Sequence, residues 1–124
     1  MSLEGQRIFV VEDEILIALD IEDLITASKG EVAGRAATLA EAMRLADAPG
    51  LSLAVLDFHL GPDNSLPVAA KLNEAGVPFL FHTGRDFFLI SEAWPQAPVV
   101  AKTGFRGELL SAMVSLAAKK GHSK

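Results

Sequence analysis

The side chains that could do chemistry share one property: each closes or directly follows a short apolar run. They are an acidic triplet after residues 7–11 (Glu12, Asp13 and Glu14), a carboxylate after residues 53–56 (Asp57), a hydroxyl after residues 77–82 (Thr83) and an ammonium after residues 99–101 (Lys102). Runs of this kind are typical of strands buried on both faces. In open α/β sheets, ligands and chemistry gather beyond the carboxyl ends of such strands.

Together these groups suit phosphoryl transfer. Clustered carboxylates raise each other's pKa unless a cation joins them, and oxygen-rich sites of this kind suit Mg²⁺. A lysine and a hydroxyl at the same edge would bind an anionic ligand. A carboxylate such as Asp57 is a competent nucleophile that forms an aspartyl phosphate. The sequence therefore predicts a magnesium-dependent phosphoryl site, provided that these strand ends meet.

The elements that must position these groups alternate along the chain. Helices with amphipathic patterns separate the strands, and the segment 85–94 is ambiguous because its apolar residues are consecutive and not periodic. Such alternation with short connections predicts a parallel sheet with helices on both faces. The expected strands are 7–11, 31–37, 53–56, 77–82 and 99–101, and the expected helices are 15–28, 39–47, 66–75 and 106–119.

Local signals mark the ends of two of these helices. Ile17, Ile21 and Ile25 fall on one stripe of the first helix, which Lys29 and Gly30 are expected to end. Thr38-Leu39-Ala40-Glu41 has the capping-box pattern, in which hydroxyl and carboxylate satisfy backbone donors at the start of the second helix.

Length and composition bound the class of protein. The 124 residues predict a single domain, 1–124, with a flexible basic tail at about 120–124. A net charge of −5 argues against nucleic-acid binding, and the absence of cysteine excludes disulfides and thiol catalysis. We find no signal peptide and no apolar run of the ~18 residues that a membrane span needs. We therefore expect a cytoplasmic protein with neither nucleic acid nor membrane as partner.

Four motifs in this order resemble the receiver domain of two-component response regulators. They cover essentially the whole chain: Val10-Val11-Glu12-Asp13-Glu14, Val55-Leu56-Asp57-Phe58-His59-Leu60, the Thr83-Gly84 step, and Val100-Ala101-Lys102. The resemblance implies a flavodoxin-like (βα)5 fold, a doubly wound parallel five-stranded sheet with strand order 2-1-3-4-5.

The resemblance also implies a role for each matching residue. Asp57 would accept a phosphoryl group from a sensor histidine kinase or a histidine phosphotransfer protein. Glu12 and Asp13 would bind Mg²⁺ together with Asp57 and the backbone carbonyl of His59. Thr83 and Lys102 would contact the phosphoryl oxygens, and the small Gly84 would leave the site accessible.

The sequence departs from the family pattern in three places. Thr103 follows Lys102 where the family usually has proline after a cis peptide, so we expect a trans bond or a strained loop. Val99 stands where the family has an aromatic switch residue on its last strand. The segment 78–84 is similar to the phenylalanine-alanine-threonine-glycine signature of a subgroup of stand-alone receivers found in alphaproteobacteria, with His82 in place of the alanine. Phe87 or Phe88 is then the candidate switch aromatic.

These observations favour a stand-alone receiver that signals by binding an unknown downstream protein. It would not be an enzyme beyond its own phosphorylation and dephosphorylation. The alternative is a pseudo-receiver that binds a partner without phosphorylation. A phosphatase of the haloacid dehalogenase type would need a second aspartate at the position of His59, and a flavodoxin-like cofactor binder would need a phosphate-cradling loop where the acidic triplet 12–14 lies. His59 could line the rim of the pocket, and Arg85 could reach a phosphoryl group, a partner or solvent.

Overall fold

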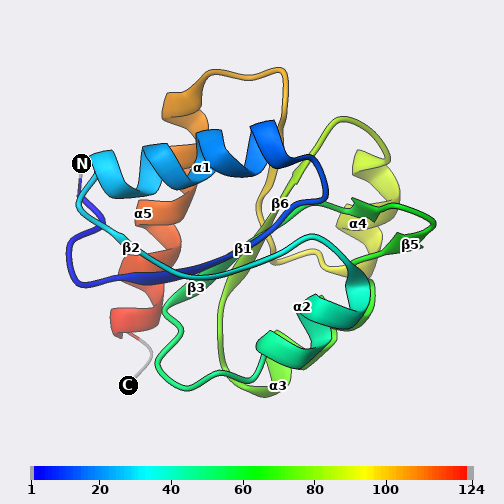
Figure 1. The fold of residues 1–124 in the computed structure, drawn as a ribbon, viewed down its shortest axis with the longest axis horizontal. Coiled ribbons are helices and arrows are strands. Elements are labelled where there is room, and N and C mark those ends of the chain that lie inside the picture. The colour runs from blue at the N-terminus through cyan, green and yellow to red at the C-terminus, as the bar shows by residue number, and fades with distance from the viewer. Residues whose placement is uncertain (1, 123–124) are drawn as a thin grey trace.

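Five parallel strands form the central sheet of the computed structural model, which describes residues 2–122 and the side chains of residues 2–119 (Figure 1). The order of these strands across the sheet is β2-β1-β3-β6-β7, so in chain order they run 2-1-3-4-5, as the resemblance implies. Their bounds are β1 (Arg7–Val11), β2 (Glu31–Ala36), β3 (Leu53–Leu56), β6 (Phe79–Thr83) and β7 (Val99–Ala101).

Helices cover both faces of this sheet. In Figure 1, α1 and α5 lie on one side of it, and α2, α3 and α4 lie on the other. No helix among the described residues is both long enough and apolar enough to cross a membrane. The helices are α1 (Ile15–Ala27), α2 (Leu39–Leu45), α3 (Leu66–Glu74), α4 (Phe87–Ala93) and α5 (Arg106–His122).

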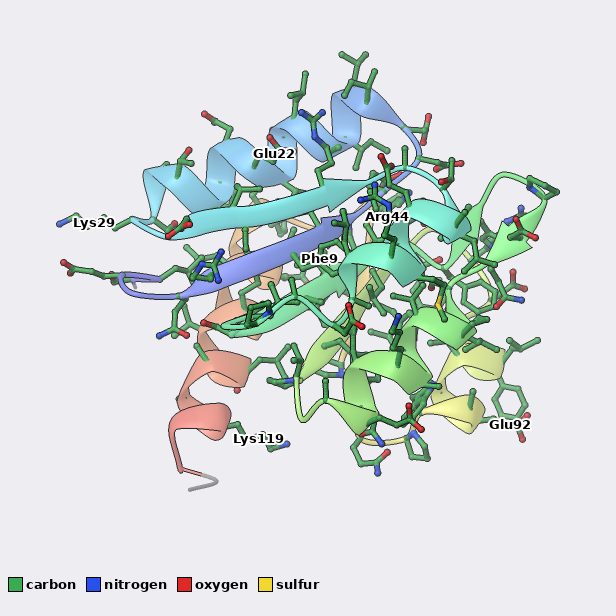
Figure 2. All side chains as sticks on the ribbon, turned by 60° about the horizontal axis from the view of Figure 1, so that its bottom comes forward. Phe9, Glu22, Lys29, Arg44, Glu92 and Lys119 are labelled. Atoms are coloured by element: carbon green, nitrogen blue, oxygen red, sulfur yellow. The ribbon has the colours of Figure 1, made fainter. Side chains whose placement is uncertain are left out.

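The two helical layers make separate cores because strand side chains alternate between the faces of the sheet. Within β1, Ile8 and Val10 are buried against α1 and α5, whereas Phe9 and Val11 are buried against the opposite layer. Figure 2 shows Phe9 in the middle of the molecule. The continuous apolar run of β1 therefore reflects burial on both faces, as expected for a parallel sheet.

Several boundaries differ from those expected from the sequence. The ambiguous segment 85–94 contains the short helix α4, and the expected loop 61–65 contains half of an antiparallel hairpin, β4 (His59–Leu60) with β5 (Asp63–Asn64). The strand expected at 77–82 begins and ends later, as β6. Helix α5 continues to His122, past the end expected at residue 119. Residues 123–124 of the expected tail lie outside the described residues.

The end of α1 is built differently from the expectation. Lys29, and not Gly30, takes the left-handed conformation after the helix, with φ of 72°. Gly30 has a different reason to be glycine, because a Cβ there would lie 2.9 Å from Cγ2 of Ile25 and 3.0 Å from Cβ of Leu3. The buried face also shifts slightly, since Ala18 is buried and Ile17 only half-buried.

The start of α2 matches the predicted capping box. The Thr38 hydroxyl accepts a hydrogen bond from the Glu41 backbone N–H at 3.2 Å. The Glu41 carboxylate in turn accepts from the Ala37 N–H at 2.8 Å, one residue before the usual partner. Two backbone donors at this helix end are thereby satisfied.

Candidate functional site

Main-chain hydrogen bonds hold the residues that follow the strands. The N–H of Glu12 donates to the Ala36 carbonyl at 3.0 Å, and the N–H of Asp57 donates to the Val11 carbonyl at 2.8 Å. The N–H of Lys102 donates to the Thr83 carbonyl at 2.9 Å. Each bond continues a parallel ladder one step past the end of the strand. The backbone of the sheet therefore places these residues at one edge.

Three of the predicted side chains meet in a buried ionic cluster. Lys102 Nζ lies 3.1 Å from Oε1 of Glu12 and 3.2 Å from Oδ1 of Asp57. The Glu12 residue is 1% exposed and Asp57 is 4% exposed, so water screens these charges weakly. One ammonium thus partly neutralises two carboxylates, and the cluster retains negative charge.

Burial and this residual negative charge shift the pKa values of the carboxyl groups. Burial, followed by the neighbouring Asp57, raises the pKa of Glu12 to about 8. Burial likewise raises the pKa of Asp57. Burial alone would lower the pKa of Lys102, but the charges of Asp57 and Glu12 outweigh it and raise that pKa. The described residues supply less positive charge than the carboxylates require.

Asp13 completes an acidic triad at the mouth of the cluster. One carboxylate oxygen from each of Glu12, Asp13 and Asp57 lies within 4.8 Å of the other two. Asp13 is exposed and accepts a hydrogen bond from the Gly61 N–H at 3.1 Å. Burial alone would raise the pKa of Asp13, but the Gly61 hydrogen bond and those from the neighbouring carboxyl groups hold it below its usual value.

The triad fits a hard divalent cation. Oε1 of Glu12 is buried and has no aligned hydrogen bond among the described residues, although Lys102 Nζ lies 3.1 Å away. A buried oxygen without an aligned donor, next to two further carboxylates, is a suitable ligand for Mg²⁺, which binds oxygen and usually keeps several waters. The donor set is therefore consistent with a metal ion that neutralises the remaining charge.

Thr83 lies at the end of β6, beside Lys102, but its hydroxyl has another partner. Oγ1 of Thr83 donates to the Arg85 carbonyl at 2.9 Å, and the Thr83 residue is fully buried. The next residue, Gly84, is exposed, and a Cβ built there would meet no atom within 4 Å. The Arg85 residue is also exposed. The loop after β6 thus leaves open space beside a hydroxyl that is turned toward its own loop.

Asp86 is a residue of this region that the sequence did not single out. Oδ2 of Asp86 lies 2.8 Å from Nε2 of His59, and His59 is the second residue after Asp57. The two residues are separated by 27 positions, so no local pattern reveals the contact. His59 lies on the hairpin strand β4 and its side chain is about one-third exposed, at the rim of the site.

The three departures from the family pattern have structural counterparts. The described backbone contains no cis peptide bond, so Lys102 and Thr103 are joined by a trans bond. Val99 is half-buried on β7. Phe87 and Phe88 both lie on α4, with 41% and 77% of their surfaces exposed. These aromatic rings are therefore available at the surface and do not fill the core.

Comparisons with known proteins give matches at the level of sequence and of structure. The chain is 35% identical over 115 residues to the phyllosphere-induced regulator PhyR of Methylorubrum extorquens strain AM1. That match covers 90% of this chain and 43% of PhyR, so the chain spans less than half the length of this relative. No family model matches the sequence.

Two solved structures extend the likeness over nearly complete chains. SdrG from Sphingomonas melonis Fr1 is 31% identical, with a TM-score of 0.79, and the match covers 94% of this chain and 98% of SdrG. A response regulator receiver protein from Sinorhizobium medicae has a TM-score of 0.85 over 96% of this chain and 99% of its own. Its identity is 21%, so this second match bears on the fold alone.

Proposed function

This chain belongs to the receiver-domain family of response regulators, and on that basis we propose that it is a phosphorylation-driven switch whose phosphoacceptor is Asp57. The observation that carries the proposal is the cluster of Glu12, Asp57 and Lys102, with Lys102 Nζ about equally far from the two carboxylates. A buried carboxylate beside one ammonium and an acidic pair is the donor set that transfer of a phosphoryl group to an aspartate requires.

The reaction is a displacement at phosphorus. A carboxylate oxygen of Asp57 forms a P–O bond while the P–N bond to the imidazole of a phosphohistidine breaks. The leaving nitrogen keeps the electron pair of that bond, and a proton on the other ring nitrogen of the phosphohistidine lets the donor leave as neutral histidine. Asp57 becomes an aspartyl phosphate, and later attack of water on its phosphorus restores the carboxylate and releases inorganic phosphate.

Lys102 and Thr83 stabilise the product in this scheme. Lys102 already lies 3.2 Å from Oδ1 of Asp57, so its ammonium can pair with a phosphoryl oxygen on that residue after a small displacement. The Thr83 hydroxyl would leave the Arg85 carbonyl and donate to another phosphoryl oxygen. Modification of Asp57 would thereby rearrange the loop after β6.

The Mg²⁺ ion would be held by Glu12, Asp13, Asp57 and the backbone carbonyl of His59. When bound, it supplies positive charge that offsets the charge gathering on the phosphoryl oxygens. Burial and the neighbouring Asp57 raise the pKa of Glu12 to about 8, so its ionised form is costly in the metal-free protein, and a bound cation would favour that form.

The output of the switch is proposed to be protein binding. A sensor histidine kinase or a histidine phosphotransfer protein would supply the phosphoryl group, and an unidentified downstream protein would recognise the modified form in the cytoplasm. Under this proposal the chain acts as a stand-alone receiver and catalyses no reaction on another substrate.

The test is intact-mass measurement after incubation with a small phosphodonor such as acetyl phosphate and Mg²⁺. The expected result is one added phosphoryl group that disappears in Asp57→Asn and when the metal is chelated. Asp63→Asn is the matched control, because Asp63 is an exposed carboxylate on the nearby β5 and should leave the adduct unchanged. If no adduct forms while a known receiver reacts under the same conditions, the chain is the pseudo-receiver alternative, with binding independent of phosphorylation.

A further inference from the structure

A side-chain hydrogen bond joins the strand β4, which follows Asp57, to the start of α4. Nε2 of His59 lies 2.8 Å from Oδ2 of Asp86. Because an ionised carboxylate only accepts hydrogen bonds, Nε2 carries the proton and donates to Asp86. The pair joins β4 to the residue that precedes α4.

Asp86 occupies an unusual position for this contact. It precedes the first residue of α4 in a left-handed conformation with φ of 64°, which few residues other than glycine adopt. An aspartate at this place usually caps the helix by accepting from a backbone N–H of its first turn. Asp86 makes no such bond, and its carboxylate contacts His59 instead. The carboxylate of Asp86 thus binds across to β4 and not to its own helix.

Both ends of the pair are connected to the chemistry of the site. His59 lies two residues after Asp57. The ring of Phe58 packs edge-on against the imidazole of His59, with 4.8 Å between the two ring centroids. Asp86 lies three residues after Thr83, whose hydroxyl is bonded to the Arg85 carbonyl in the same loop. A change at Asp57 or Thr83 therefore reaches the pair through a few consecutive residues.

We propose that the His59–Asp86 pair is a latch that holds the start of α4 in its resting position and is released when Asp57 is modified. The release rests on the proposed function, because the movement of Thr83 toward a phosphoryl oxygen frees the Arg85 carbonyl and loosens the loop. In this account both side chains are positioning residues.

The latch is tested first without any phosphodonor, by hydrogen exchange of α4. The Ile90 N–H donates to the Asp86 carbonyl at 3.1 Å, and the Trp94 N–H donates to the Ile90 carbonyl at 2.9 Å, so these amides report on the helix. In His59→Ala, their exchange should rise about two- to fivefold, which is the effect of losing one partly exposed polar contact between side chains. Amides of the central strand β3 should keep their wild-type rates.

Matched variants separate the latch from general strain. Asp86→Gly removes the carboxylate and accepts the left-handed backbone, and it should raise α4 exchange as His59→Ala does. Lys29→Gly likewise places glycine at a left-handed position, here at the end of α1 with φ of 72°. It should leave the hydrogen exchange of α4 unchanged. His59→Gln keeps an N–H donor and should restore part of the protection. The double variant that combines His59→Ala and Asp86→Gly should show the same α4 exchange rates as either single variant.

Release is tested with beryllofluoride and Mg²⁺, a phosphoryl mimic whose binding is followed independently by fluorine NMR. In the wild type, the bound mimic should raise α4 exchange to the rate seen in His59→Ala without the mimic. In His59→Ala, binding of the mimic should not raise α4 exchange any further. The latch is overturned if His59→Ala leaves the exchange of α4 at its wild-type rate, or changes β3 and α4 equally. Bound mimic without any change in α4 would overturn the release. Absence of fluorine binding would count against the proposed function, while the experiment on free protein still decides the latch.

Discussion

Lys102 and Glu12 form an ion pair that the sheet buries at its carboxyl edge, with Nζ and Oε1 3.1 Å apart and the Glu12 side chain fully inaccessible to solvent. The two residues are 90 positions apart in the sequence. Their meeting follows from the topology, because β1 and β7 are parallel strands of one sheet and end at the same edge.

Lys102→Met should destabilise the metal-free protein. The substitution leaves two buried carboxylates without their shared cation, and an uncompensated buried acceptor costs about 1–3 kcal/mol. Urea unfolding at neutral pH should therefore show a lower midpoint with an unchanged slope. Saturating Mg²⁺ should recover part of the loss, since the metal supplies the missing charge. An unchanged midpoint would mean that the ammonium contributes nothing to the resting fold.

Glu12→Gln should have the opposite effect on stability. Its carboxylate is destabilised by burial and by Asp57, so a neutral amide of nearly the same shape should raise the free energy of unfolding of the metal-free protein. The same change should weaken Mg²⁺ binding about 10–100-fold, measured by calorimetry. Glu14→Gln is the control, because Glu14 is exposed and meets Glu12 only through its backbone N–H. Undiminished Mg²⁺ affinity in Glu12→Gln would remove Glu12 from the metal site.

His82 should make the stability of the protein depend on pH in the acid range. Its Nδ1 is buried without a hydrogen-bond partner among the described residues, and burial, aided by the charge of Lys102 and opposed by Asp20, lowers the pKa of His82 to about 4. The unfolded state therefore binds a proton more readily between about pH 6.5 and 4. The favourable contribution of neutral His82 is complete above pH 6.5 and is lost progressively as the pH falls toward 4.

The measurement compares the wild type with His82→Leu by urea unfolding at several pH values. The difference between their free energies of unfolding should change by about 3 kcal/mol between pH 7 and 4, with the wild type losing more stability on acidification. Comparing the two proteins cancels the titration of the carboxylates that they share. A constant difference over this range would contradict the burial of an uncharged imidazole at this place.

Gly30→Ala should destabilise the packing beneath α1. The new methyl group would lie 2.9 Å from Cγ2 of Ile25 and 3.0 Å from Cβ of Leu3, and forcing extra volume into a packed core costs about 1–3 kcal/mol. Gly34→Ala is a matched control four residues later, on β2, because its methyl group would meet Phe9 at an ordinary 3.6 Å. Thermal unfolding of the two variants should separate them, and equal midpoints would show that the α1 contact relaxes freely.

The sheet and most of the acidic cluster could be predicted from the sequence for the same reason. Strands such as β1 and β3 are buried on both faces, so their apolar runs are continuous, and the residue after each run must lie at the shared carboxyl edge. The meeting of Glu12, Asp57 and Lys102 follows from this one rule.

Helix α4 and its contacts could not be predicted in this way. Phe87, Phe88 and Leu89 are consecutive apolar residues that stay exposed, so the segment has no periodic pattern to mark a buried face. The pairing of Asp86 with His59 depends on the tertiary fold, and so does the orientation of the Thr83 hydroxyl. An aspartate before a helix predicts a side-chain cap, whereas here the carboxylate of Asp86 contacts His59 on β4.

The main-chain bonds that extend each ladder past its strand bear on how this edge can diversify in evolution. Glu12, Asp57 and Lys102 are each held through their own N–H, which every residue except proline possesses. Their Cα positions are therefore inherited from the sheet and do not depend on which side chain is present. Single substitutions at this edge therefore leave the backbone of the sheet in place. Related proteins can gain or lose the phosphoryl chemistry while they keep the fold.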